Sequence, residues 1–328
     1  MQALLLGSDP AAGLPGGWTL PIANRPWIEH WIAQGREQGI VDLVVAVGMQ
    51  DEMDIRSLLG DGTRYGMRIA YLTGSEPLGT AGTIKLAEPL LQERFIVLHA
   101  DAVHAFRLDD LMAYHAERAA AATICLTPGG RYSPHGVVTV DSESEVLSLV
   151  PGPSPHNAPS NLNNSGVYMM SKSALSLIPE GRYVSLENET FPLLIGNGSK
   201  ISGYIPDTYC MLTTTPESYV QLHWDLLDRR LPLSISGTEM NERGIWIGKG
   251  AIIGKGVLLV PPVVIGDYAR IGDKAIVGPY TVIGPYCTVG QGARISRTIV
   301  PARSAVNDSS RLSERVFGSG ATVAEASL

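Results

Sequence analysis

A single carboxylate follows an apolar stretch in the first third of the chain. Residues 95–99 are typical of a buried strand, and Asp101 comes two residues after it. A carboxylate at a strand end can bind a divalent cation or simply belong to a turn. Its position beside His99, in an otherwise apolar run, favours the metal site.

Other short motifs could also contact a ligand. Residues 76–82 (Glu-Pro-Leu-Gly-Thr-Ala-Gly) form a turn of small residues that opens a helical pattern. Glycine there permits close backbone approach by a ligand, although small residues also start helices for packing reasons. Further polar motifs lie at residues 134–138, 164–168, 185–189 and 215–219. Taken alone, each of these could be a turn or a solvated surface group.

The elements that must position these motifs alternate along the chain. Strand-like runs at residues 43–47, 68–72, 95–99 and 122–126 alternate with helical patterns at residues 27–38, 81–91 and 108–119. This alternation predicts a mainly parallel sheet covered by helices on both faces, with ligands at the carboxyl ends of the strands. Further elements are predicted at residues 136–140 and 146–150 (strands), 151–164 (a loop) and 218–229 (a closing helix).

The last third of the chain repeats every six residues. Nine aliphatic residues stand at every sixth position from Ile247 to Ile295, and seven of the nine are followed directly by glycine. Each aliphatic is expected to point into a narrow prism, and each glycine to let the chain turn a corner. The pattern resembles the hexapeptide-repeat left-handed β-helices, with about three coils over residues 245–300. The phase slips after Val300, and Leu312, Val316, Phe317 and Val323 indicate an irregular continuation or a cap.

In their order and spacing, the motifs of the first 230 residues resemble those of the sugar-1-phosphate nucleotidyltransferases, particularly the mannose-1-phosphate guanylyltransferase branch. The resemblance covers nearly the entire chain, because members often carry a left-handed β-helix after the catalytic domain. It implies an α/β fold with a Rossmann-like mixed sheet at residues 1–230, a linker at 231–244 and a left-handed parallel β-helix at 245–328.

The resemblance also implies a reaction and a site. In that family the phosphate of a sugar-1-phosphate attacks the α-phosphorus of a nucleoside triphosphate and releases pyrophosphate. The implied nucleotide-binding residues are Leu6, Gly7, Glu76, Gly79, Thr80 and Gly82. The implied sugar-binding residues are Gly136, Asn164, Gly166 and Glu187. Asp101 matches the first metal-binding Asp of the family, which would hold Mg²⁺ if the chain is active.

Three departures from the family pattern remove charge from the phosphate path. Residues 7–20 contain no Lys or Arg, where the family has an Arg in a glycine loop and a Pro-Lys-Pro step. The second metal-binding Asp of the family aligns with Leu212, and Pro151-Gly152-Pro153 stands in place of Glu-Lys-Pro. Crowded phosphates need such positive charge. We therefore expect a pseudoenzyme that binds a nucleotide sugar or sugar phosphate as a regulatory or assembly subunit, with no catalytic residue assigned.

Two other functions fit the sequence less well. An active nucleotidyltransferase with a rearranged phosphate loop would need Arg25 or Lys85 to supply the missing cations. An acyltransferase site in the repeats would need a histidine as general base, and all seven histidines precede the repeats.

Composition limits the partners and the compartment. The formal net charge is −7, and no basic run points to nucleic acid. The three cysteines show no CxxC spacing, which predicts reduced thiols in the cytoplasm. No signal-peptide pattern or membrane-spanning apolar run is present in the sequence. Because β-helix faces and ends commonly mediate assembly, we expect a homo-oligomer or a hetero-oligomer with an active relative.

Overall fold

The computed structural model describes residues 1–7, 17–74, 77–129, 135–152, 157–240 and 243–316. The chain forms two compact units. The first contains Met1–Asp9 and Ile32–Leu212, and the second contains Pro10–Trp31 and Thr213–Leu328. Among the described residues, no helix has both the length and the apolarity needed to cross a membrane.

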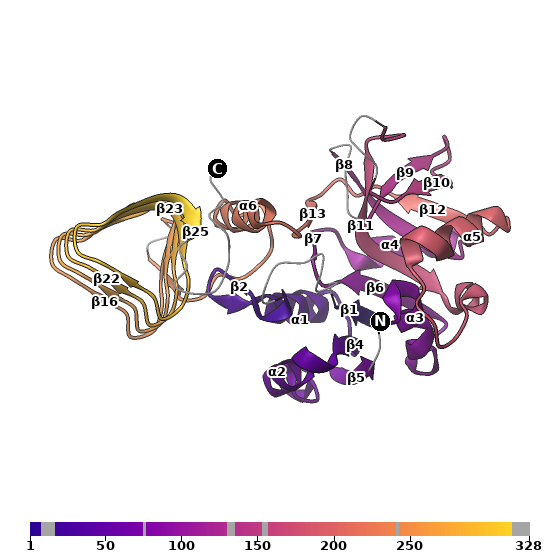
Figure 1. Ribbon diagram of the computed structural model, residues 1–328, viewed down its shortest axis with the longest axis horizontal. Helices are drawn as coiled ribbons and strands as arrows, with labels where there is room; N and C mark the ends of the chain where they lie inside the picture. Colours follow the sequence, from indigo (N-terminus) through magenta and orange to yellow (C-terminus); the bar gives the residue numbers. More distant parts are fainter. Residues whose placement is uncertain (8–16, 75–76, 130–134, 153–156, 241–242, 317–328) are drawn as a thin grey trace. The chain divides into compact units, whose positions relative to one another are not determined.

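The first unit is built on a nine-stranded mixed sheet, drawn in indigo to pink in Figure 1. Strand β1 lies between β4 and β6 and is parallel to both, and β5 adds to β4 in the same direction. The long strand β11 runs antiparallel to β6, β8 and β9, so the sheet is mixed rather than mainly parallel. The strands are β1 (Gln2–Leu6), β4 (Asp42–Gly48), β5 (Arg68–Gly74), β6 (Arg94–His99), β8 (Ala122–Pro128), β9 (Val137–Val140), β10 (Val146–Val150), β11 (Leu162–Ser171) and β12 (Ile201–Tyr204).

Helices cover both faces of this sheet, as predicted. The side chains of a strand point alternately to opposite faces. In β8, Ile124 belongs to the core cluster that also contains Ile84 of α3 (Gly79–Ala87). The neighbouring Thr123 instead shares a 2.9 Å hydrogen bond with His115 of α4 (Leu108–Arg118). Helices α3 and α4 therefore lie on opposite faces, and α2 (Met49–Leu59) packs on β4 and β5.

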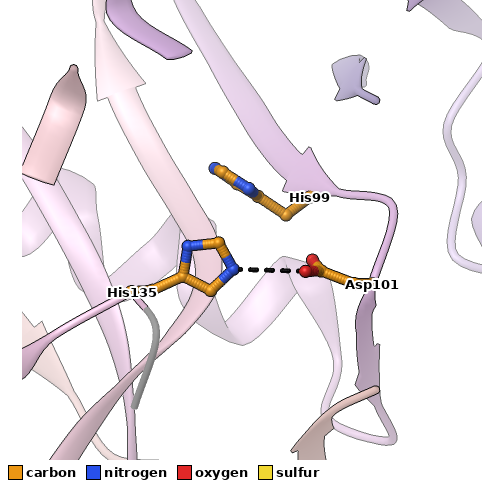
Figure 2. A group of neighbouring side chains, drawn as sticks. All are labelled: His99, Asp101 and His135. Carbon is orange, nitrogen blue, oxygen red and sulfur yellow. Dashed lines mark ion pairs between the residues drawn. The ribbon is translucent and has the colours of Figure 1, made fainter. Parts of the chain in front are cut away.

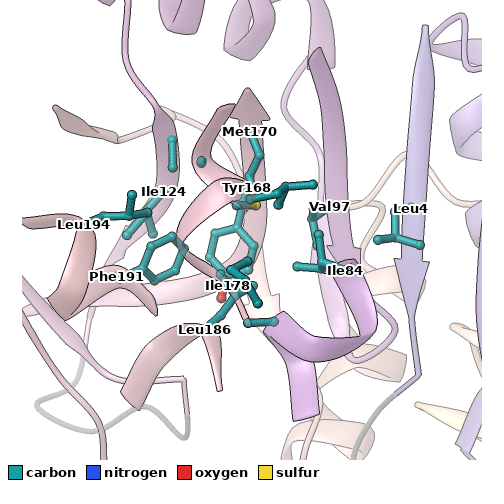
Figure 3. Close-up of a cluster of buried hydrophobic side chains, with 14 of the residues drawn as sticks. Leu4, Ile84, Val97, Ile124, Tyr168, Met170, Ile178, Leu186, Phe191 and Leu194 are labelled. Carbon is teal, nitrogen blue, oxygen red and sulfur yellow. The ribbon is translucent and has the colours of Figure 1, made fainter. Parts of the chain in front are cut away.

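The core of the first unit includes the ring of a tyrosine, Tyr168 (Figure 3). Tyr168 of β11 is fully buried, and its ring lies 5.3 Å from that of Phe191. Phe191 begins α5 (Phe191–Gly196), which directly follows a short π-helix, η5 (Leu186–Thr190). Apolar side chains of these elements thus enclose the tyrosine ring and leave its hydroxyl to the polar residues described below.

The second unit contains a parallel β-helix whose coils trace a triangle in Figure 1, in orange to yellow. From β15 to β20 (Ile276–Val277), each strand pairs in parallel with the strand eighteen residues further on, as Ile245 does with Val263 and Val263 with Thr281. Three six-residue repeats therefore make one coil, which confirms the predicted β-helix. Its strands run from β15 (Ile245–Ile247) to β25 (Arg311–Val316), and β14 (Thr238–Glu239) adds antiparallel to β15. The same unit contains α6 (Pro216–Leu227).

The phase slip in the sequence is a coil one residue short. Ile276 pairs with Arg294, eighteen residues on, whereas Val282 pairs with Ile299, only seventeen residues on. Strand β23 (Arg294–Val300) still pairs with β25, so the helix continues through Val316. Phe317 and Val323, which were also expected to take part, lie outside the described residues.

Corner glycines let successive coils approach one another. A Cβ added to Gly272 would lie 2.7 Å from the backbone nitrogen of Gln291, and one added to Gly254 would lie 2.6 Å from Asp273 Oδ1. Real Cβ atoms do not approach other atoms so closely. The obstacle at these corners is therefore the next coil.

Replacing Gly272 with Ala should lower the free energy of unfolding by about 1–3 kcal/mol, because the coils must separate to admit the methyl group. Chemical denaturation followed by circular dichroism measures this. The control is Arg270→Ala in the same coil, at an exposed side chain, where we expect a change within about 0.5 kcal/mol. Equal stability of the two variants would show that the spacing between coils is not set by the contact at Gly272.

A buried histidine couples the stability of the first unit to pH. His104, at the end of β7 (Ala102–His104), is completely buried, and its ring packs 4.4 Å from that of Phe106. Burial disfavours the charged imidazolium and lowers the pKa of His104 to about 4.

Because the unfolded chain binds this proton more tightly, stability should fall as the pH drops from 6.5 towards 4, with His104 contributing up to roughly 3 kcal/mol. Urea unfolding at several pH values tests this. His104→Gln should flatten the slope of unfolding free energy against pH, whatever its stability at pH 7. An unchanged slope would show that His104 does not titrate in this range.

Candidate functional site

The candidate site lies at the carboxyl ends of two neighbouring parallel strands. Leu6 of β1 pairs with His99 of β6, and the Ala100 backbone nitrogen donates to the Leu6 carbonyl at 2.9 Å. Asp101 follows immediately. Ligand sites of open α/β sheets form at this edge, because the connections to other elements begin there.

Two histidines surround Asp101, as Figure 2 shows. Asp101 Oδ2 lies 3.4 Å from His135 Nε2, and the rings of His99 and His135 meet edge to face, with centroids 4.4 Å apart. The His99 side chain is 3% exposed, while those of Asp101 and His135 are 10% and 14% exposed. The cluster is therefore largely buried, and what exposure remains is at Asp101 and His135.

Glu187 of η5 is the second carboxylate of the cluster. Its Oε1 lies 3.7 Å from both His99 Nε2 and His135 Nδ1, and it accepts a 3.1 Å hydrogen bond from the Tyr168 hydroxyl. His135 thus has Asp101 on one ring nitrogen and Glu187 on the other.

The remaining oxygen of Glu187 ties two chain segments together. Its Oε2 accepts hydrogen bonds from the hydroxyls of Thr80 (3.1 Å) and Ser185 (3.0 Å). Thr80, in the first turn of α3, also accepts from the Leu186 backbone nitrogen at 2.8 Å. These bonds fix the start of α3 against η5, so Glu187 cannot turn away from the histidines without breaking them.

Asn164 of β11 holds the other side of the site. Its Nδ2 donates to the His135 carbonyl and to the Tyr168 hydroxyl oxygen, both at 2.9 Å. Its Oδ1 accepts from the Gly166 nitrogen at 3.1 Å, and its backbone nitrogen donates to the Gly136 carbonyl at 2.9 Å. Asn164 therefore fixes the loop that carries His135.

For His135 and Glu187, the neighbouring charges shift the pKa in the opposite direction to burial, and by more. Burial lowers the pKa of His135, but Asp101 and Glu187 outweigh it and raise this pKa to about 10. Burial raises the pKa of Glu187, but the neighbouring histidines outweigh it and lower the value to about 2. Burial, together with the charge on His135, lowers the pKa of His99 to about 4. At neutral pH His135 is thus a cation between two carboxylates, and His99 is neutral.

The donor set does not suit Mg²⁺. One oxygen or nitrogen atom from each of His99, Asp101 and His135 lies within 4.8 Å of the others. Mg²⁺ needs near-octahedral oxygen ligands, and two of these three donors are imidazoles. The position expected for a second metal-binding Asp is Leu212 on β13 (Cys210–Leu212), which pairs with Ala102 and offers no ligand atom.

Two glycines of the predicted nucleotide turn have a packing role. A Cβ on Gly79, whose φ is +69°, would lie 2.5 Å from the Val184 carbonyl oxygen, and one on Gly82 would lie 2.8 Å from that of Arg182. The Gly82 nitrogen donates to the Val184 carbonyl at 3.2 Å. Close approach of residues 182–184 is therefore enough to require glycine at both positions.

The structure brings together five predicted site residues from four motifs that are distant in sequence, namely Asp101, Thr80, Asn164, Gly166 and Glu187. Gly136 contributes its carbonyl, and Gly7 lies at the end of β1, where its nitrogen donates to Ala46. Glu76 lies outside the described residues. His99, His135 and Tyr168 are site residues that the sequence prediction missed. Two of them had a signal in the sequence: His99 stands at the end of an apolar strand, and His135 directly precedes a glycine.

Replacing Tyr168 with Phe should lower the free energy of unfolding by about 1–2 kcal/mol, because the buried Glu187 loses a donor and the Asn164 amide loses an acceptor. Calorimetric or chemical unfolding measures the change. Tyr183→Phe is the matched control, since that tyrosine is 58% exposed. If both variants matched the wild type, the hydroxyl would not be part of the network.

Comparison with known proteins shows the family to which this chain belongs. Residues 19–228 match the family model "Nucleotidyl transferase", and residues 259–327 match "GMPPB C-terminal domain". The mannose-1-phosphate guanylyltransferase of Mycobacterium tuberculosis is 30% identical over 210 residues, and the mannose-1-phosphate guanyltransferase of Candida albicans is 34% identical over 200. These matches cover 63% and 58% of this chain, but only 58% and 55% of the relatives.

Solved structures agree at the level of fold. HddC from Yersinia pseudotuberculosis superposes with a TM-score of 0.58 at 20% identity, covering 69% of this chain and 99% of that one. A second structure of HddC, complexed with GMP-PN, gives a TM-score of 0.56 at 19% identity over the same shares of the two chains. Since the family model spans most of the first unit and well over half of the sequence, the chain belongs to the sugar-1-phosphate nucleotidyltransferase family.

Proposed function

We propose that this chain is a catalytically impaired nucleotidyltransferase that binds a nucleotide sugar and acts as a regulatory or assembly subunit. The observation that carries the proposal is that the Asp101 carboxylate is already paired with a histidine. The carboxylate pairs with His135 at 3.4 Å, and the second position expected for a metal-binding Asp is Leu212. Family members generally use a divalent metal, and phosphoryl transfer depends on charge at the phosphates.

The cations that could replace the missing ones are engaged elsewhere. Lys85 Nζ forms a 2.6 Å ion pair with Glu88 and donates to the Leu175 carbonyl at 3.3 Å. In the second unit, Arg25 pairs with Glu29 at 3.2 Å. Neither side chain is poised to neutralise a triphosphate. This weakens the alternative of an active, Mg²⁺-dependent guanylyltransferase with a rearranged loop.

Ligand binding is supported by the polar residues that remain. Glu187, Asn164 and Thr80 are held in place by hydrogen bonds of 2.8–3.1 Å. Glu187 and Asn164 are buried and already hydrogen-bonded within the protein, so they would fix the shape of the site and thereby reduce the ordering cost of binding a ligand. The names of the relatives, and the nucleotide analogue bound to HddC, suggest a guanosine nucleotide sugar as the first ligand to test.

We also propose domain limits at residues 1–230, 231–244 and 245–328, with the β-helix holding subunits together. Cys125, Cys210 and Cys287 are free thiols, which supports a reducing, cytoplasmic setting. Light scattering of the intact chain, alone and mixed with an active guanylyltransferase, would identify a homo-oligomer or a mixed assembly.

Purified protein should bind GDP-mannose without forming it. At one hundred times the dissociation constant, the ligand should raise the melting temperature by roughly 5–10 °C in EDTA. Under the same conditions with Mg²⁺, GTP and mannose-1-phosphate, pyrophosphate release should stay at background. Glu187→Gln should weaken binding about 10- to 100-fold in calorimetry, because a charged acceptor is lost.

Glu189→Gln is the matched control for this experiment. It makes the same change two residues away, at a side chain that is 41% exposed and pairs with Arg182, and it should bind like the wild type. Metal-dependent pyrophosphate release that disappears in Asp101→Ala would reject the impaired-enzyme proposal. Absence of any melting shift across a panel of nucleotide sugars would reject ligand binding.

A further inference from the structure

We propose that His99, Asp101 and His135 form a binding site for a divalent transition-metal ion of the Zn²⁺ class. Two imidazoles and one carboxylate are donors that such ions prefer over Mg²⁺. The inference goes beyond the proposed function, because it concerns the ion alone and holds with or without a nucleotide.

The three donors are close enough to share one ion. They lie within 4.8 Å of one another, whereas ligand atoms about 2.0–2.2 Å from a tetrahedral ion are roughly 3.3 Å apart. The widest pair must therefore close by at most about 1.5 Å. The Asp101–His135 pair, at 3.4 Å, already has the required separation.

Two buried atoms in the cluster call for a partner. Among the described residues, His99 Nε2 and Asp101 Oδ1 have no hydrogen-bond partner. A buried polar atom without a partner costs free energy. His99 is only 2% exposed, so water does not compensate its ring nitrogen and a bound ion would remove a real penalty.

The surroundings match those of known metal centres. Metal-binding histidines usually direct their second ring nitrogen at a carboxylate or carbonyl, which fixes the ring. His135 Nε2 faces Asp101, and its Nδ1 lies 3.7 Å from Glu187 Oε1. Glu187 is itself held by Tyr168, Thr80 and Ser185, and the His135 carbonyl accepts from Asn164. These second contacts orient the donors before any ion arrives. His135 must release its proton to solvent when the ion binds, because only the neutral imidazole has a lone pair for the metal.

A further ligand would complete the coordination of the ion. Three protein donors are one short of the usual four for Zn²⁺. The remaining position would face the side where Asp101 and His135 are 10% and 14% exposed. Water or an oxygen of a bound phosphate could occupy it.

Titration of the full-length, EDTA-treated protein with Co²⁺ and Zn²⁺ tests the site, with no nucleotide present. We expect one ion per chain by calorimetry, displacement of Co²⁺ by Zn²⁺, and visible Co²⁺ absorption of the intensity that tetrahedral coordination gives. Mg²⁺ in large excess should leave this spectrum unchanged. This titration uses the wild-type protein, so its result does not depend on the folding of any variant.

Variants locate the ion. His135→Asn and Asp101→Asn should abolish the Co²⁺ spectrum, and Glu187→Gln should weaken binding about 10- to 100-fold. His115→Asn is the matched control, a buried histidine of α4 that hydrogen-bonds Thr123 and Ser171, and it should keep wild-type binding. Far-ultraviolet circular dichroism confirms that each variant is folded.

Three outcomes would overturn the proposal: no stoichiometric Co²⁺ or Zn²⁺ binding by the wild type, the same binding in His135→Asn, or equal displacement by Mg²⁺. The first would make the cluster an internal ion pair only. None of these outcomes changes the result of nucleotide-sugar binding measured in EDTA. A failure of the metal site can therefore be distinguished from a failure of the proposed function.

Discussion

The first unit depends on how two buried carboxylates are compensated at the carboxyl edge of its sheet. Removing a carboxylate from water is expensive unless opposite charge and hydrogen bonds replace the lost hydration. Asp101 and Glu187 meet this demand through one shared histidine, with Tyr168, Thr80 and Ser185 completing the shell of Glu187. Strand β11, the start of α3 and η5 are all tied to this centre. Their hydrogen bonds therefore decide the local fold as well as the local chemistry.

In the proposed function, the same compensation separates this site from one built for phosphoryl transfer. A carboxylate that binds Mg²⁺ needs an oxygen available to the ion, whereas the charge of Asp101 is neutralised by His135. The position opposite Ala102 carries the aliphatic Leu212. Ligand binding can survive such a change, because it depends on a site of fixed shape and polarity and needs no strong field at the phosphates.

Local patterns predicted much of this molecule, and long-range pairing accounts for the rest. The six-residue period from Ile247 to Ile295 predicted the β-helix because each strand there pairs with strands of the neighbouring coils, and the period itself encodes that pairing. Asp101 and Glu187 could be predicted by family resemblance. The roles of His99 and His135 could not, since they depend on β11 running antiparallel between β6 and β8. A register formed across some seventy residues leaves no periodic trace in the sequence.

The shortened coil of the β-helix shows where this stack tolerates a change of length. Up to Arg294, the strands of successive coils pair at a separation of eighteen residues. The turn from Val282 to Ile299 contains one residue fewer, yet the strands on either side of it still pair in parallel. The missing residue is therefore taken up at the corner between Ile295 and Ile299, and the pairing of β23 with β25 keeps the rows of side chains in step through Val316. Insertions and deletions at the corners of such a helix thus cost less than changes within its strands, because only the strands carry the pairing between coils.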